Sequence, residues 1–105
     1  MNHRKPTLGD LDLYLAICRA GSLTKAARLR HTSQPAISAG LKRLESLLGA
    51  RLIERERKTF ALTPAGIRFR DYCETALRGW DDIRDGRVPE RTPRAKIGFQ
   101  PAVGA

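Results

Sequence analysis

A chain of 105 residues, 41% hydrophobic and 30% charged, has room for one small domain and an appendage but not for a large internal ligand cavity. No apolar run approaches the ~20 residues of a membrane span, and Asp10 and Asp12 interrupt the stretch after the basic N-terminus, so the sequence predicts neither a membrane helix nor a secretion signal. Lysine and arginine outnumber aspartate and glutamate by 20 to 11, and ten of these cations lie between Arg19 and Lys58 against three carboxylates, a one-sided charge expected of a surface that binds a polyanion.

Two helices separated by short turns are predicted in the first third of the chain. Apolar residues recur at steps of three and four over residues 8–18, and Gly21 ends this pattern. Ser22 and Thr24 offer side-chain oxygens that can cap a second, shorter helix, which runs to Leu29. A polar turn then leads into a third helix.

The third helix is predicted over residues 34–48, with Ser33 as its cap and Gly49 placed to end it. Gln34 and Pro35 occupy its first turn, where a proline removes no helical hydrogen bond. One stripe is apolar and should face the core: Ile37, Leu41, Leu44 and Leu48. The opposite face is small and basic: Pro35, Ala39 and Ser46, flanked by Ser38, Lys42 and Arg43.

After Gly49 the apolar spacing changes to two, which predicts a β-hairpin with strands at residues 52–55 and 60–62. Its tip at residues 55–59 is basic and carries Arg55, Arg57 and Lys58. If the polyanion is DNA, such a tip would lie against the neighbouring minor groove or phosphates.

A long helix is predicted from Pro64 to about Asp85, too long for so small a core to cover. Its apolar positions are spaced like a coiled-coil seam: Ala65, Phe69, Tyr72, Ala76, Trp80 and Ile83. We expect a second copy of the chain to cover this row, with a dimer interface of Phe69, Tyr72, Ala76, Trp80 and Ile83. Beyond Gly86, prolines and charges predict a linker.

Three helices followed by a basic hairpin predict a winged helix-turn-helix. The major groove of DNA admits one α-helix, whose first turns must bring side chains to the base edges. Gln34 can pair with adenine, and Pro35 and Ala39 can touch a thymine methyl group. The residues expected to contact DNA are Thr24, Lys25, Ser33, Gln34, Pro35, Ser38, Ala39, Lys42, Arg43, Arg55, Arg57 and Lys58.

No catalytic or metal site can be assembled from the sequence. Cys18 and Cys73 lie far apart without the spacing of a zinc or redox site, and His3 and His31 have no second ligand or acid nearby in the sequence. We therefore expect packing roles for the cysteines, no cofactor, no metal, no enzymatic activity and a cytoplasmic location.

A series of motifs resembles the DNA-binding domain of LysR-type transcription regulators. In order, the motifs are Ala26-Ala27, Ser33-Gln34-Pro35-Ala36-Ile37-Ser38, Leu41, Leu44-Glu45, Leu48-Gly49, Leu52, Glu54-Arg55 and Leu62-Thr63-Pro64-Ala65-Gly66. The resemblance covers residues 8–87 and implies a homodimer held by antiparallel pairing of the long helices, often a dimer of dimers, on an interrupted dyad near a promoter. It also implies that the tail from Arg94 begins a sensing domain absent from this chain, through which alone a small-molecule effector would act.

Two positions depart from the family's pattern. Arg30 stands where a leucine is usual, and Leu29 precedes it, so we expect a shifted packing of the second helix. Ala39 and Gly40 replace an arginine and a polar residue common in relatives, and a glycine inside a helix costs about 1 kcal/mol relative to alanine. Direct base contact from that part of the helix is correspondingly less expected.

Three alternatives remain open at this point. The small, basic face of the third helix could face only solvent. A LysR-like winged helix also occurs in molybdate-responsive regulators, which only the sequence of a further domain would separate. A winged helix can also bind protein or RNA, and competition between duplex DNA and RNA at one salt concentration would distinguish that function.

The sequence therefore predicts a mainly α chain with three parts. Residues 1–63 form a winged helix-turn-helix of three helices and a two-stranded β-hairpin, residues 64–87 a dimerisation helix, and residues 88–105 a hinge and the start of an effector-binding domain. The predicted function is sequence-specific binding of double-stranded DNA by a homodimeric bacterial transcription regulator, with helix 34–48 in the major groove and the wing at 55–59 on the minor groove or the backbone.

Overall fold

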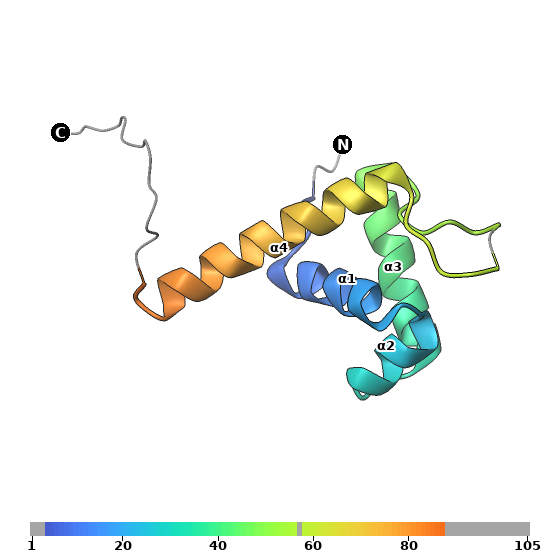
Figure 1. Cartoon of the computed structure of the whole chain (residues 1–105), viewed down its shortest axis with the longest axis horizontal. Helices are drawn as coiled ribbons and strands as arrows, with labels where there is room; N and C mark the ends of the chain where they lie inside the picture. Colours follow the sequence, from blue (N-terminus) through green and yellow to red (C-terminus); the bar gives the residue numbers. More distant parts are fainter. Residues whose placement is uncertain (1–3, 57, 88–105) are drawn as a thin grey trace.

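The computed structural model describes residues 4–56 and 58–87. Over these residues the chain forms four helices: α1 (Leu8–Ala20), α2 (Leu23–Leu29), α3 (Gln34–Leu48) and α4 (Pro64–Arg84). Helix α1 contacts each of the other three, and the C-terminal end of α4 extends away from them (Figure 1). The four helices predicted from the sequence are confirmed, whereas residues 88–105, the predicted hinge, lie outside the described residues.

Each helix begins at a hydroxyl side chain that accepts a backbone hydrogen bond. The acceptors are Thr7, Ser22, Ser33 and Thr63, and the donors are the N–H groups of Asp10, Lys25, Ala36 and Gly66. A cap of this kind stabilises a helix by about 1 kcal/mol. Gly21 and Gly49 end α1 and α3 with φ angles of 74° and 70°, the left-handed conformation that glycine adopts without strain.

The core lies where α1 crosses α3 and α4. Tyr14 is fully buried there, and its hydroxyl donates a 2.9 Å hydrogen bond to the carbonyl of Gly66 at the start of α4. The Tyr14 ring also packs on that of Phe69, with 5.1 Å between the ring centroids. Gly66 permits this packing, because a Cβ at that position would overlap the backbone carbonyl oxygen of Leu52.

Gly40 marks a second close approach, between α1 and α3. A Cβ at this position would overlap Cδ2 of Leu13 in α1. The glycine that departs from the family's pattern therefore belongs to a contact between helices. Leu29, the other departure, is 66% exposed beside Arg30, so the end of α2 adds no leucine to the core.

The predicted two-stranded hairpin is not formed within the described residues. Ile53 and Leu62 make a single antiparallel bridge, supported by hydrogen bonds from the Glu54 N–H to the Ala61 carbonyl and from the Thr63 N–H to the Leu52 carbonyl. Only the base of the hairpin has buried apolar side chains, and beyond it exposed charged residues offer nothing to hold a longer ladder. We call residues 54–61 the wing loop.

The predicted seam on α4 is shorter than its spacing indicated. Phe69, expected to be exposed in this row, is only 8% exposed because α4 passes over Tyr14 of α1 at that point. The remaining large members stay accessible: Tyr72 is 58%, Trp80 45% and Ile83 71% exposed. Leu48 also differs from its expected place in the core stripe, because at the end of α3 it is 39% exposed.

Candidate nucleic-acid interface

A tight turn aims the start of α3 outward. Only four residues, 30–33, separate α2 from α3, and the Thr32 N–H bonds to the carbonyl of Ala27 across that turn. His31 takes a φ of 55°, a left-handed conformation uncommon for a residue with a side chain. Ser33 then caps α3, and the first turn of the helix, residues 34–36, is exposed.

The outer face of α3 is accessible over its first half. Gln34, Pro35 and Ala39 are exposed, and Ser38 is half-buried. Ile37 on the opposite side is 2% exposed and holds the helix to the core. The small side chains leave the helix backbone open to close approach by a large ligand such as a DNA groove.

The cations predicted to contact DNA lie on α2, α3 and the wing loop, and the structure divides them into two groups. Lys25 at the start of α2, Lys42 on α3 and Lys58 in the wing loop are exposed, and no ion pair is found for them among the described residues. Arg43 and Arg55, in contrast, are bound to carboxylates. Thr24 is exposed at the first turn of α2, and Arg57 lies outside the described residues.

Arg43 forms a bidentate pair with Asp10 at the start of α1. Nη2 of Arg43 lies 2.5 Å from Oδ1 of Asp10, and Nη1 lies 3.2 Å from Oδ2. The bonds from Arg43 hold the pKa of the Asp10 carboxyl below its usual value, although burial opposes that shift. The pKa of Arg43 is raised by the same bonds.

Arg55 pairs with Glu45, which joins α3 to the wing loop. Oε1 of Glu45 lies 2.5 Å from Nη2 of Arg55, and Oε2 accepts the backbone N–H of Leu52 at 2.8 Å. Sequence reasoning missed Asp10 and Glu45. Only Asp10 had a local signal, because Thr7 and Asp10 stand in the spacing of a capping box.

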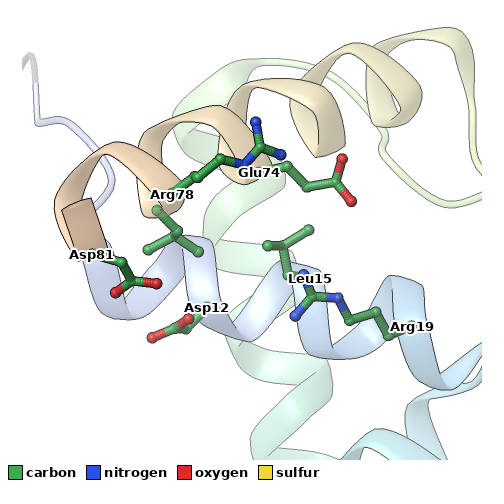
Figure 2. Close-up of a pocket in the computed structure, with 7 residues that line it drawn as sticks. Asp12, Leu15, Arg19, Glu74, Arg78 and Asp81 are labelled. Atoms are coloured by element: carbon green, nitrogen blue, oxygen red, sulfur yellow. The ribbon is translucent and has the colours of Figure 1, made fainter. Parts of the chain in front are cut away.

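A groove between α1 and α4 carries mixed charges. Figure 2 shows acidic and basic side chains from both helices around it, and its volume is about 350 Å³. It is lined by Asp12, Leu15, Arg19, Glu74, Leu77, Arg78 and Asp81. Three carboxylates beside two guanidinium groups give no excess positive charge, so this groove does not extend the basic surface around α3.

The two cysteines, the other residues considered for chemistry, are packed among other side chains. Cys73 is fully buried and Cys18 half-buried, and burial raises the pKa of the Cys73 thiol to about 12, far from that of a reactive thiolate. Within residues 4–56 and 58–87, no three His, Cys, Asp or Glu side chains gather as a metal site requires. No helix of that part of the chain is long and apolar enough to cross a membrane.

Two helices joined by a tight turn, the second with an exposed outer face that carries Lys42, define the class of helix-turn-helix DNA-binding proteins. The sequence pattern of the bacterial regulatory helix-turn-helix proteins of the lysR family matches residues 8–67, and the chain belongs to that family. The family consists of transcription regulators and not of enzymes.

Similar proteins include curated regulators and solved complexes. The transcriptional activator protein LysR of Escherichia coli is 40% identical over 72% of this chain, and a probable RuBisCO transcriptional regulator of Thalassiosira pseudonana is 36% identical over 94%. The chain spans 24% and 33% of these two relatives' lengths. The crystal structure of a BenM DBD/benA site 1 DNA complex covers 76% of this chain and 93% of its own, with a TM-score of 0.73 and 31% identity.

Proposed function

We propose that this chain binds double-stranded DNA in a sequence-specific manner, as a homodimer, within a bacterial transcription regulator of the cytoplasm. The observation that carries the proposal is the exposed, small-sided outer face of α3 beside lysines without ion-pair partners among the described residues. Similarity to two BenM DBD/DNA complexes supports it. A downstream effector-binding domain stays a prediction.

In the proposed complex, the first turns of α3 enter the major groove. Gln34 in the first turn reaches a base edge, and Pro35 and Ala39 allow the helix backbone to approach. Lys42 and the wing loop, through Lys58, contact phosphates or the adjacent minor groove. A partner helix covers Tyr72, Ala76, Trp80 and Ile83 on α4.

The DNA affinities of two alanine variants, measured at several salt concentrations, test the proposed contacts. A preferred site is first selected from a random duplex library, and affinities for that site and for a scrambled duplex are then measured over a series of salt concentrations. Gln34→Ala should weaken the selected site by about 1 to 3 kcal/mol and scarcely change binding to the scrambled duplex. Lys58→Ala should weaken both duplexes alike and lower the logarithmic salt slope by about one unit for each phosphate that the variant no longer binds.

Thr75→Ala, an exposed change on α4 away from α3, serves as the control and should alter neither quantity. Absence of any preference among duplexes, or tighter binding to RNA at the same salt concentration, would contradict the proposed function. If Gln34→Ala weakened both duplexes equally, the assignment of α3 to the base edges would be wrong.

A further inference from the structure

Asp10 is a charged side chain removed from water. Its exposed fraction is 5%, and within the described residues it is the one buried charged side chain. Its carboxylate accepts the backbone N–H of Thr7 at 2.9 Å and both terminal nitrogens of Arg43. A buried carboxylate loses the solvation of water, so its position depends on keeping these three donors.

The partner, Arg43 on α3, is held against α1 by these bonds to Asp10. A guanidinium that meets a carboxylate through two parallel bonds is fixed in direction as well as in distance. The two donors that face Asp10 are unavailable to a phosphate unless the pair breaks, and breaking it leaves a buried charge without its partner. Lys42, the adjacent residue on α3, is exposed and has no ion pair in the described part of the chain.

We propose that Arg43 is a positioning residue and not a phosphate ligand: through Asp10 it sets the angle of α3 against the N-terminal end of α1. This inference rests on the proposed function, because the angle matters for what α3 contacts. Gln34 lies nine residues before Arg43, or ~13 Å along the helix axis. A tilt of about 5° about the Arg43 end would move Gln34 by ~1 Å, more than the ~0.5 Å within which a binding group must be held.

The capping box extends the effect of the pair to the beginning of α1. Thr7 and Asp10 exchange backbone and side-chain bonds there, at 2.9 Å and 3.1 Å. The same carboxylate therefore caps α1 and holds α3, so loss of either bond loosens both helices. Tyr14, one helical turn further along α1, connects this end to α4 through its bond to Gly66.

Variants of Arg43 and Asp10 separate a positioning residue from a phosphate ligand. They are measured on the selected and scrambled duplexes over a salt series, well below the unfolding temperature of each variant. Lys42→Gln, the matched control on the same helix, should lower the salt slope by about one unit on both duplexes and leave the unfolding temperature unchanged. Arg43→Gln should leave that slope unchanged and reduce the ratio of selected to scrambled affinity roughly fivefold or more, because it shifts Gln34 from its base edge.

Arg43→Lys is the most discriminating substitution, because lysine keeps the charge but lacks the two-pronged geometry. If Arg43 is a positioning residue, Arg43→Lys should lose as much discrimination between the two duplexes as Arg43→Gln. If Arg43 is a phosphate ligand, Arg43→Lys should bind both duplexes as the wild type does. Asp10→Asn should give the same loss, and the double variant Asp10→Asn/Arg43→Gln should be no worse than either single change.

Thermal unfolding of the wild type, Asp10→Asn, Arg43→Gln and the double variant provides a readout without DNA. Each single change should lower the unfolding temperature by about 4 °C or more, and the two losses should not add, because the changes remove one shared interaction. Additive losses would overturn the pairing. Unchanged discrimination in Arg43→Gln, or a salt slope lowered as far as in Lys42→Gln, would overturn the positioning role. Failure of the wild-type chain to bind any duplex would refute the proposed function instead. The unfolding temperatures of the single and double variants would still show whether Asp10 and Arg43 stabilise the fold through one shared interaction.

Discussion

Gly66 and Gly79 lie on the same helix in opposite surroundings. A Cβ at Gly66 would overlap the Leu52 carbonyl oxygen and lie 2.8 Å from the Tyr14 hydroxyl, whereas a Cβ at Gly79 would meet nothing within 4 Å. The backbone carbonyl cannot turn aside as a flexible side chain can. The same added methyl group should therefore change the stability of the protein differently at the two positions.

We expect Gly66→Ala to lower the free energy of unfolding by about 1 to 3 kcal/mol, because it forces α4 away from the core. Gly79→Ala should raise the stability of a single protomer by about 1 kcal/mol, since it removes a glycine from an exposed helix interior without any clash inside that protomer. Urea unfolding of both variants beside the wild-type chain measures the two effects. Similar stability changes in both variants would show that α4 and the Leu52 backbone do not approach closely at Gly66.

At the residue scale, short-range chemistry was predictable and long-range pairing was not. Ser22 and Ser33 were identified as caps because the bonds they accept come from three residues away, and the structure confirms both. Arg43 was predicted to contact DNA, since nothing near it in the sequence indicates that Asp10, 33 residues earlier, would be its partner. Charge along the sequence predicts a basic surface but not which cations in it are free.

Glu45 connects two elements that a DNA duplex would have to meet together. One carboxylate oxygen accepts the Leu52 N–H and the other binds Arg55, which joins α3 to the base of the wing loop. Its side chain is 11% exposed, so water offers the Leu52 N–H little replacement. The ion pair with Arg55 lies nearer the surface and contributes less.

Glu45→Ala should lower the free energy of unfolding by about 1 to 3 kcal/mol, because it leaves the largely buried Leu52 N–H without its acceptor. Glu45→Gln keeps an oxygen for that N–H and loses only the ion pair, so most of the stability should remain. Glu56→Ala, an exposed change in the wing loop, is the control and should change little. Equal losses in Glu45→Ala and Glu45→Gln would assign the effect to the ion pair instead.

The elements themselves were predictable to different degrees. All four helices were expected, because their apolar spacing, caps and terminal glycines are local signals. The strands of the wing were not correctly predicted, since alternating residues make a strand only where a partner continues the ladder, and here the pairing stops at Ile53 and Leu62. Phe69 has the spacing of a seam residue, yet the crossing of α1 decides which part of that stripe is covered.

At the scale of the whole molecule, the end of α4 presents apolar side chains beyond the core. Tyr72, Trp80 and Ile83 are large and exposed and fall within an arc of about 80° on the helix at ~100° per residue. Half-buried Ala76 lies between Tyr72 and Trp80 along the same stripe. Ile67 is 44% exposed on the same helix, but it points about 140° away from Tyr72 and Trp80.

Tyr72→Glu/Trp80→Glu should convert the proposed homodimer into monomers, because a symmetric contact would place all four new carboxylates in one apolar interface. Sedimentation at tens of micromolar measures the change. Ile67→Glu, a matched change on the other side of α4, should leave the dimer intact. A wild-type chain that sediments as a monomer would contradict the proposal.

The same variants should bind DNA in a way that depends on the number of half-sites. Two linked recognition helices engage two half-sites with one loss of translational freedom, so an intact dimer binds a two-half-site duplex far more tightly than a single one. Tyr72→Glu/Trp80→Glu should therefore lose roughly 10²-fold or more on the two-half-site duplex and bind a single half-site as the wild type does. Equal losses on both duplexes would mean that the substitutions disturb α3 itself, since the single half-site requires only one protomer.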